Sequence, residues 1–337
     1  MIIKEIINFL DSKIAPNLAY SWDNPGLQVG SQNWEVKKIF LTLDVNEISI
    51  QQAINQKADL IISHHPFIFR PIKSVTDSLT LKLIEHKIGV FSAHTNLDVI
   101  SGGVNSVLAD LFGLKNRKFI DSNIDADFYF ATFYLPQNLY TKASLIIEKN
   151  GGKLLQKQIM IQNDANLIKV EFSSDSFKMN KIVGEIRNFH PDKKVDVQIY
   201  KQQKNNPEYG LGIQGKLAEP LTLIDFAEMV KSKLGVPKIN LWLGNKKETD
   251  LIKNIAVCGG TGASLLSKLR KNVDCFVSSD FTYHTILDSK IPLIDAGHLY
   301  TEYPILSYFE KILAKFEVEI YKSSLAEQKY SQKMKIK

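Results

Sequence analysis

The chain has 337 residues, of which 44% are hydrophobic and 23% charged, a size that indicates about two domains. The formal net charge is only +6 and the lysines are scattered, so the sequence does not favour nucleic-acid binding. The N-terminal segment has the pattern of an amphipathic helix and not that of a signal peptide. No stretch is as long as the run of about eighteen apolar residues that a membrane span needs. We therefore expect a cytoplasmic protein without a membrane segment, whose two cysteines, Cys258 and Cys275, are buried and reduced.

The first third of the chain alternates strands and helices with short links. We predict strands over 38–43, 59–62 and 88–92. We predict a first helix that ends near residue 14, and further helices over 46–57, 78–86 and 104–112. This order is typical of a layered α/β domain, which we assign to residues 1–122. A strong turn motif occupies 23–26, and we expect the preceding Trp22 to fill the core rather than to line a pocket.

The pattern of predicted elements changes in the middle of the chain. We predict strands over 127–135, 159–161, 168–172 and 195–200, and helices over 139–150 and 223–234. Alternating, aromatic-rich strands are typical of antiparallel pairing. We therefore assign residues 123–248 to an inserted α+β domain.

Residues 249–337 again show the alternating strand and helix pattern of the first third, and we assign them to the second half of the core. A strand over 255–258 runs into the glycine turn 259–262 and a helix that ends near 269. Such a turn either packs a strand tightly on a helix or holds an anion at the helix N-terminus. The glycine spacing is neither a P-loop nor a full dinucleotide fingerprint.

The last third repeats a pattern of the first. Residues 58–65 match 273–280, and residues 87–92 match 290–295. Each second strand is followed by a histidine and, four residues on, a carboxylate: His94 with Asp98, and His298 with Glu302. This pattern predicts two related α/β halves whose strand ends face one another.

Two adjacent histidines, His64 and His65, end the buried strand of the first half. Ligands bind at the carboxyl edge of open α/β sheets, so this pair is a candidate site. If the halves face each other, five candidate ligands converge: His64, His65, Asp98, His298 and Glu302. Imidazole and carboxylate are ligands of Zn²⁺, Mn²⁺, Fe²⁺ and Ni²⁺, and two carboxylate-bridged ions would use all five. By the repeat, His94 is as good a candidate as His298, and Asp280 and Asp295 are candidates to orient the imidazoles.

Five motifs in order carry a resemblance to a known family. They are WDNPGL at 22–27, DLIISHHP at 59–66, HTNLD at 94–98, GGTGA at 259–263 and DAGHLYTE at 295–302. With these motifs the chain resembles the GTP cyclohydrolase 1 type 2 homologues, also called NGG-interacting factor three-like proteins. The match covers both outer segments, about two thirds of the chain.

The resemblance implies a duplicated three-layer α/β/α core with mixed sheets, interrupted by an inserted PII/CutA-like α+β domain. It also implies two divalent metal ions per chain and a toroidal homohexamer with the sites facing an internal cavity. In this arrangement His65 and Asp98 hold one ion, His64 and His298 the other, and Glu302 bridges them.

The sequence departs from the family pattern at two places. Ser278-Ser279 stands where many members have Thr-Gly before the aspartate, although Asp280 and His284 are retained. The glycine- and proline-rich stretch usual in the insert is absent around 156–177, which puts any ligand of the insert in doubt.

Two functions follow from these expectations. The first is a metal-dependent hydrolase acting on a nucleotide-like small molecule, with GTP suggested only by the family's name. In this hypothesis His94 and His284 either move protons or merely line the pocket. The alternative is a non-enzymatic metal- or partner-binding regulatory protein.

Overall fold

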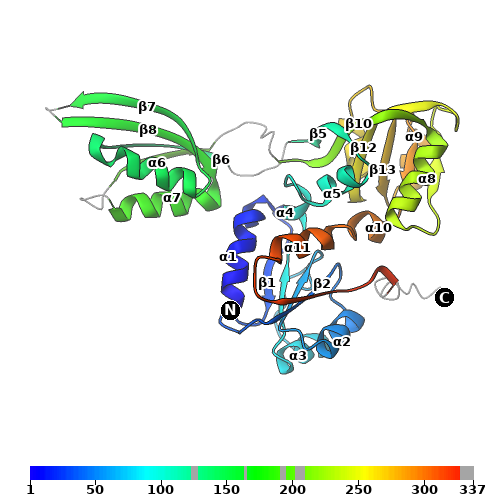
Figure 1. Cartoon of the computed structure of the whole chain (residues 1–337), viewed down its shortest axis with the longest axis horizontal. Coiled ribbons are helices and arrows are strands. Elements are labelled where there is room, and N and C mark those ends of the chain that lie inside the picture. Colours follow the sequence, from blue (N-terminus) through cyan, green and yellow to red (C-terminus); the bar gives the residue numbers. More distant parts are fainter. Residues whose placement is uncertain (123–127, 163–164, 190–194, 202–208, 327–337) are drawn as a thin grey trace. The chain divides into compact units, whose positions relative to one another are not determined.

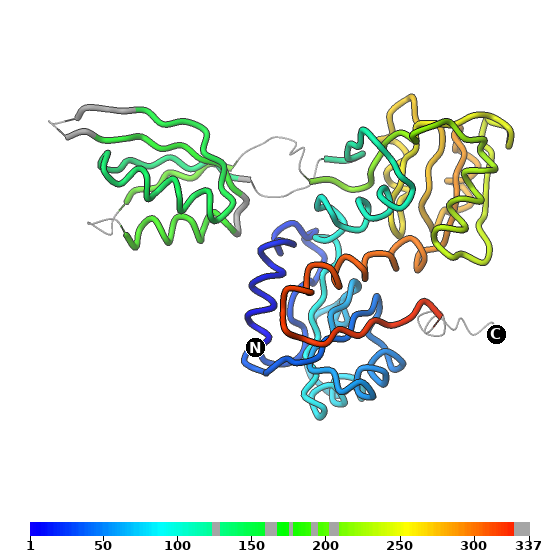
Figure 2. The backbone as a smooth tube through the Cα atoms, viewed as in Figure 1, coloured from blue at the N-terminus to red at the C-terminus, as the bar shows by residue number. Residues whose placement is uncertain are grey.

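The computed structural model describes residues 1–122, 128–162, 165–189, 195–201 and 209–326. The chain divides into two compact units, traced in Figures 1 and 2. The core unit takes residues 1–14, 19–124 and 206–337, and the insert unit takes 15–18 and 125–205. No helix in the described part of the chain is long and apolar enough to cross a membrane.

The first half of the core unit is built on a five-stranded sheet with the order β1-β4-β3-β2-β15. Four strands are parallel, and β1 is antiparallel to β4. The strands are β1 (Gly26–Val29), β2 (Lys38–Thr42), β3 (Leu60–Ser63), β4 (Gly89–Ser92) and β15 (Glu319–Lys322). The helices of this half are α1 (Ile3–Lys13), α2 (Glu47–Asn55), α3 (Ser78–Glu85), α4 (Thr95–Asp98) and α11 (Ile305–Leu313).

Helices cover both faces of this sheet, as the predicted layers require (Figure 1). On one face Ile50 of α2 and Leu83 of α3 pack with Phe40 and Ile61 of the strands. The opposite face receives α1 so closely that a Cβ on Gly89 would lie 2.6 Å from Ile3 Cδ1. Adjacent strand residues point to opposite faces, so each buried strand needs apolar residues at nearly every position.

The second half of the core unit is a six-stranded mixed sheet with the order β11-β14-β13-β12-β10-β5. The strands are β5 (Lys115–Asp121), β10 (Leu211–Thr222), β11 (Asn240–Trp242), β12 (Leu251–Thr261), β13 (Cys275–Ser279) and β14 (Leu293–Asp295). Helices α5 (Val104–Leu111) and α8 (Leu223–Leu234) pack on one face, and η3 (Ala263–Lys268) and α9 (Tyr283–Asp288) on the other. Helix α10 (His298–Glu302) follows β14. The predicted mixed, layered α/β architecture is therefore present in both halves.

The repeat seen in the sequence has a structural counterpart. Strands β3 and β4 are parallel neighbours, as are β13 and β14. A short helix follows the second strand of each pair, α4 in the first half and α10 in the second. The two cysteines are free and buried in the second half, as predicted.

The insert unit has its own sheet and its own core. Its elements run β6 (Phe128–Pro136), α6 (Tyr140–Lys149), β7 (Lys153–Gln162), β8 (Ala165–Asp175), α7 (Ser176–Phe189) and β9 (Val197–Lys201). The antiparallel strand order β7-β8-β6-β9 with this β-α-β-β-α-β sequence is a ferredoxin-like arrangement. Phe133 and Phe172 of the sheet pack with Ile147 and Ile182 of the two helices.

The end of the insert differs from the expected boundary at 248. Residues 209–248 supply strands β10 and β11 to the six-stranded core sheet and helix α8 to one of its faces. Phe226 and Val230 of α8 pack in one core with Val257 and Cys275. The amphipathic period of this segment predicts a helix with a buried face, but it does not say which sheet that face covers.

Other local differences concern short or irregular elements. The predicted helix after the glycine turn is the 3₁₀ segment η3, and helices α7 and α11 were not predicted. In α7 the buried residues Met179, Ile182, Val183 and Ile186 have the i, i+3, i+4, i+7 spacing of an amphipathic helix, so the sequence does contain a signal for α7 that was not used.

Candidate metal centre

The end of strand β3 places two histidines at the carboxyl edge of the first sheet. The amide of His64 donates to the Thr42 carbonyl at 3.3 Å, and that of His65 to the Leu43 carbonyl at 2.9 Å. Ser63 Oγ donates to the His65 carbonyl at 2.8 Å. These bonds extend the parallel ladder past the strand, so the backbone of the histidine pair is fixed.

Four histidines of the core unit share one bonding pattern. In each, Nδ1 is held by an oxygen: His64 by the Ala93 carbonyl at 2.9 Å, His65 by Asp44 at 2.8 Å, His94 by Asp23 at 2.9 Å and His298 by Asp280 at 2.6 Å. The other ring nitrogen, Nε2, is then the one available to a ligand. Histidines that bind metals are commonly oriented in this way through their second nitrogen.

His64 gives the clearest indication of what the cluster would bind. A carbonyl only accepts, so the bond to Ala93 requires the proton on Nδ1 and leaves Nε2 of the neutral ring with a lone pair. The His64 side chain is fully buried, and its Nε2 has no hydrogen-bond partner among the described residues. Buried polar atoms are rarely left unpaired, and a cation is the partner that a lone pair among carboxylates would take.

Glu302 lies at the centre of the histidines. Its Oε2 is 3.0 Å from His65 Nε2, and its Oε1 is 3.1 Å from His298 Nε2 and 3.8 Å from His64 Nε2. Asp98 Oδ1 lies 3.6 Å from the same His64 nitrogen. The structure thus brings together all five candidate ligands named from the sequence.

The distances suggest a different sharing of ligands from the one that the resemblance implied. The ring nitrogens of His65 and His298 form one group with Glu302, with all ligand atoms within 4.8 Å of one another. Asp98 instead approaches His64. The geometry therefore pairs His65 with His298, and His64 with Asp98, rather than His65 with Asp98.

The two histidines expected to serve the reaction occupy different surroundings. His94 belongs to the cluster, because its ligand nitrogen lies within 4.8 Å of those of His64 and His65. His284 on α9 is exposed, and its ring contacts Tyr283 with 5.6 Å between centroids. Within the described residues, His284 is not part of either ligand group.

Opposing charges in the metal-free cluster shift its pKa values strongly. Burial disfavours the charged form of His298, but hydrogen bonds to Asp280 and Glu302 outweigh burial and raise its pKa to about 10. Burial likewise opposes ionisation of Glu302, yet the nearby charge of His65 and several imidazole contacts hold its pKa well below the usual value. Burial raises the pKa of Asp98. A proton on His298 thus occupies the place that a cation takes in a metal site.

A glycine at the end of β12 leaves room beside Glu302. Gly260 has a φ of +61°, and a Cβ there would lie 2.3 Å from Glu302 Oε1 and 3.1 Å from His298 Nε2. Its amide donates to Thr301 Oγ1 at 3.0 Å, and its carbonyl accepts from Ser278 and Ser279. The glycine turn therefore packs against the metal cluster. Of the two roles considered for the glycine turn, tight packing and anion binding, the contacts favour tight packing. The turn packs against the histidine and carboxylate cluster and not only against a helix.

Asn105 at the start of α5 joins the two halves next to the cluster. Its Nδ2 donates to the Asp98 carbonyl at 2.8 Å, and its Oδ1 accepts from the Gly259 amide at 3.0 Å. The side chain is buried, so both bonds are shielded from water. Asn105 therefore ties the ligand-bearing helix α4 to the ligand-bearing edge of the second sheet.

Several supporting residues were missed by the sequence analysis. Asp280 orients His298 as expected, but Asp295 accepts from the Gly297 amide instead of orienting an imidazole. Asp44 and Asp23, which hold His65 and His94, were not predicted. Asp44 follows strand β2, so the rule that polar residues at strand ends gather at one edge could have found it.

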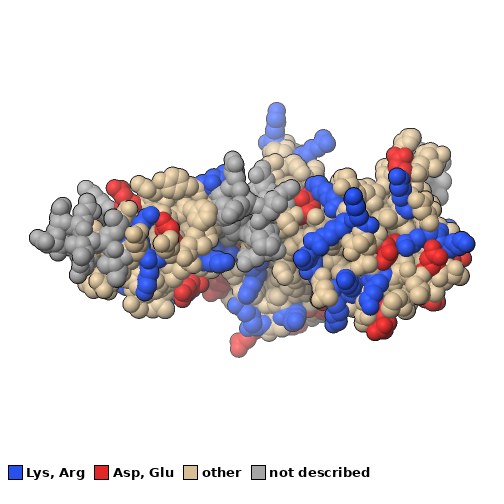
Figure 3. All heavy atoms as spheres, turned by 90° about the horizontal axis from the view of Figure 1, so that it is seen from above, with Lys and Arg blue, Asp and Glu red and all other residues tan. Residues whose placement is uncertain are grey.

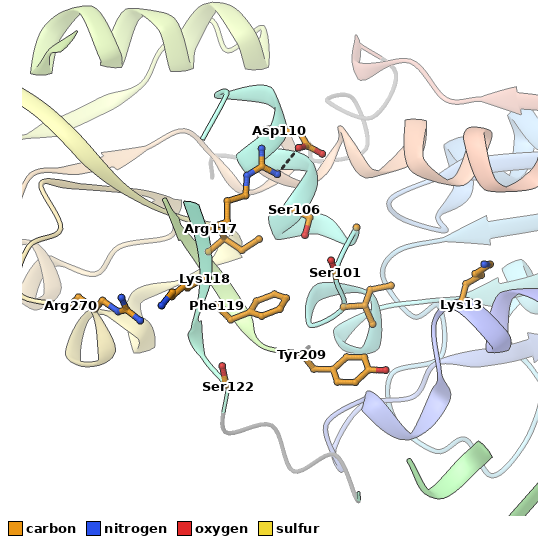
Figure 4. Close-up of a pocket in the computed structure, with 13 residues that line it drawn as sticks. Lys13, Ser101, Ser106, Asp110, Arg117, Lys118, Phe119, Ser122, Tyr209 and Arg270 are labelled. Atoms are coloured by element: carbon orange, nitrogen blue, oxygen red, sulfur yellow. Dashed lines mark hydrogen bonds and ion pairs between the residues drawn. The ribbon is translucent and has the colours of Figure 1, made fainter. Parts of the chain in front are cut away.

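A separate cavity of about 1070 Å³ lies elsewhere in the core unit. Figure 4 shows Lys118 and Arg270 on one side of Phe119 and Lys13 on the other. None of the metal-cluster residues lines this cavity. Lysine and arginine side chains are also spread over the face shown in Figure 3, with acidic side chains between them, in line with the net charge of +6.

The fold and the cluster define a class: a duplicated α/β protein with a candidate divalent-metal centre between related halves. The family model Duf34/NIF3 (NGG1p interacting factor 3) matches residues 1–329, and the chain belongs to this family.

Relatives of known name and structure agree with this assignment. The chain is 31% identical to a "GTP cyclohydrolase 1 type 2 homolog" of Listeria monocytogenes over 322 residues, covering 85% of this chain and 86% of the relative. A Staphylococcus aureus protein of the same name is 31% identical over 353 residues, with 95% of each chain covered. A Bacillus cereus protein described as related to NIF3 has a similar structure, with a TM-score of 0.80 at 26% identity, covering 96% of this chain and 97% of that one.

Proposed function

We propose that the chain binds two divalent transition-metal ions and hydrolyses a nucleotide-like small molecule. The observation that carries the proposal is the buried Nε2 of His64, which faces Asp98 and Glu302, together with the approach of His65 and His298 to the same Glu302. One ion would be held by His64, Asp98 and Glu302, and the other by His65, His298 and Glu302. Zinc, iron, manganese and nickel all accept this ligand set, so metal identity is left to measurement.

Bound ions of this kind supply a water nucleophile at neutral pH and polarise the group under attack. The chain's own residues would do the remaining work. Asp44 and Asp280 orient His65 and His298, and Asp23 orients His94, whose free nitrogen faces the cluster. An imidazole in that position can accept a proton from the attacking group or deliver one to the leaving group. The substrate class rests on the names of the relatives, which are called GTP cyclohydrolase 1 type 2 homologs.

Metal content of a Glu302 variant tests the dinuclear site. We expect about two ions per chain in the unchanged protein and a loss of most of both in Glu302→Ala, because one carboxylate contacts both ligand groups. The measurement is elemental analysis of the purified protein after metal loading. Glu317→Ala is a control with the same chemical change, since Glu317 is exposed and lies outside the cluster. A Glu302→Ala protein that keeps two ions would contradict the shared carboxylate.

A measurement of substrate turnover distinguishes the proposed hydrolase from the alternative, a non-enzymatic metal- or partner-binding regulatory protein. Metal-loaded protein should release a product, such as formate, from GTP or a related compound, and His65→Ala should abolish the release. Full metal occupancy without turnover in a broad screen of hydrolysable nucleotides would favour the metal- and partner-binding protein. The compact ferredoxin-like insert, which has its own core, would then be the element that recognises the partner.

We also propose that the chain assembles as a homohexamer. Tyr283 and Leu287 lie four residues apart on α9, so they share one face of the helix, and they are 70% and 62% exposed. Adjacent large apolar side chains on a surface are typical of contacts between copies. A second copy of the chain is therefore the proposed occupant of this face.

A further inference from the structure

An exposed cluster of aromatic side chains adjoins the metal centre. We call Tyr20, Trp22 and Phe69 the aromatic platform. The Trp22 ring lies nearly parallel to that of Tyr20, with 5.8 Å between centroids and 11° between planes, and is 5.9 Å from that of Phe69. Trp22 is nevertheless 57% exposed and Phe69 is 48% exposed. The expected core role of Trp22 is therefore wrong, and its ring is free to contact a ligand.

The platform is connected directly to the ligand cluster. The Trp22 ring meets the ring of His94 edge-on, with 6.0 Å between centroids and 72° between planes. The same His94 ring lies 5.3 Å from that of His64 and 5.5 Å from that of His65. A molecule stacked on the exposed indole would thus be separated from the candidate metal ligands His64 and His65 only by the His94 ring.

Hydrogen bonds fix the platform in place before any ligand binds. The Asp23 carboxylate, adjacent to Trp22, accepts from His94 Nδ1 and from both the amide and the hydroxyl of Thr95. The Tyr20 amide donates to Thr95 Oγ1 at 3.0 Å. Asn24 Nδ2 donates to the Ile68 carbonyl at 2.5 Å, which ties the Trp22 turn to the segment that carries Phe69. A rigid aromatic surface loses little conformational freedom on binding and therefore suits recognition.

We infer that Trp22, supported by Tyr20 and Phe69, stacks with a planar heteroaromatic ring of the substrate and holds it beside the metal centre. This inference rests on the proposed function for the identity of the bound molecule as a substrate. Every heteroaromatic base offers a flat π-face, and stacking on an indole needs no particular pattern of donors and acceptors. The platform thus recognises the ring class, while the metal cluster acts on the reactive group.

The test measures binding and metal content in the same samples of metal-loaded, full-length protein. The probes are GTP, a panel of purine, pyrimidine and pyridine nucleotides, and ribose 5-phosphate as the ligand without a ring. The variants are Trp22→Ala and Trp22→Phe, with Leu145→Ala as the control. Leu145 is 61% exposed but lies on α6 of the insert unit.

We expect Trp22→Ala to weaken binding of the best-bound nucleotide about tenfold or more, in line with typical base–aromatic stacking. Trp22→Phe should recover much of this loss, and ribose 5-phosphate should bind all variants alike. Metal content should stay at the level of the unchanged protein, which separates this result from a failure of the metal centre. If the unchanged protein binds the nucleotide ring but does not hydrolyse it, the proposed hydrolase activity is wrong while the proposed stacking role of the aromatic platform stands.

Two results would overturn the inference. One is nucleotide binding by Trp22→Ala that equals the unchanged protein, or no binding of any planar probe by the unchanged protein. The other is a change in oligomeric mass of Trp22→Ala without a change in nucleotide affinity, which would make the platform a contact between copies.

Discussion

Each clustered histidine depends on the oxygen that holds its second nitrogen. For His298 that oxygen belongs to Asp280, which itself has a left-handed backbone with a φ of +58°. Asparagine is among the few residues that tolerate this conformation, so Asp280→Asn removes the charge without straining the loop.

We predict that Asp280→Asn lowers metal affinity roughly 10- to 100-fold, the usual effect of losing a partner that orients a metal-bound histidine. Competition with a chelator of known affinity measures the change, and the circular dichroism spectrum should stay that of the unchanged protein. Asp288→Asn is the control, because Asp288 is exposed at the end of α9. Equal affinities of the Asp280 and Asp288 variants would remove Asp280 from the site.

Metal binding should also depend on pH, with a sign set by the same contacts. Despite its burial, His298 has a pKa raised to about 10 by Asp280 and Glu302, so it is protonated at neutral pH in the metal-free protein. A metal ion must displace that proton, so apparent affinity should rise as the pH is raised through neutrality toward about 10 and should fall at acidic pH. Calorimetry in buffers of different ionisation enthalpy should detect proton release on metal binding, and zero release would contradict the assignment.

The same pKa shift has the opposite consequence for the metal-free fold. A raised histidine pKa stabilises the folded protein fully below the unfolded value near 6.5, and this contribution is lost as the pH rises toward the folded value near 10. High pH therefore strengthens metal binding and weakens the metal-free protein. The two effects should be measured separately.

At the scale of elements, the end of β12 sets the space available to the cluster. Gly260→Ala would place a Cβ 2.3 Å from Glu302 Oε1, on a backbone with a φ of +61°. We predict a loss of metal binding and a decrease in the free energy of unfolding of at least about 1–2 kcal/mol, the usual cost of a left-handed non-glycine residue.

A second glycine gives the matched control for this substitution. Gly184 lies within helix α7, where a Cβ would have nothing within 4 Å. Gly184→Ala should therefore stabilise the insert unit by about 0.5–1 kcal/mol without affecting metal content. Denaturant melts and elemental analysis of the two variants make the comparison. Gly260→Ala with normal metal content would show that the cluster does not need this space.

The sequence predicted strand β3 and the four-residue spacing from His298 to Glu302 because these signals are local, although it did not predict helices α4 and α10. The β-branched run before His64 and the helical spacing from His298 to Glu302 each fit within a few residues. Asn105 could not be assigned in this way, because its partners lie on other elements of the chain, whereas Asp44 follows a strand end and could have been found by the rule that polar residues at strand ends gather at one edge. The exposure of Trp22 was missed for a similar reason, since only the packed structure shows that no core closes over it.

At the scale of the whole molecule, the exposed face of α9 argues for self-association. We predict an assembly of about six times the 38.2 kDa chain mass, measured by light scattering. Leu287→Glu should reduce that mass, because a charge buried in an apolar contact is costly. Leu145→Glu on the insert unit is the control, with a similar exposed fraction of 61%. A monomeric unchanged protein, or a Leu287→Glu protein of full mass, would contradict the proposed contact.

The attachment of the insert has a consequence for how the protein can vary. Strands β5 and β10 are antiparallel neighbours, with Asp121 opposite Leu211, and the insert unit occupies the stretch between them. The chain therefore leaves and re-enters the core sheet at adjacent points, as it does at the tip of a hairpin. Such a junction accepts a module of any size whose own ends lie close together. The ferredoxin-like unit can thus be exchanged, shortened or replaced by a simple turn during evolution or by engineering, while the strands of the core sheet keep their register.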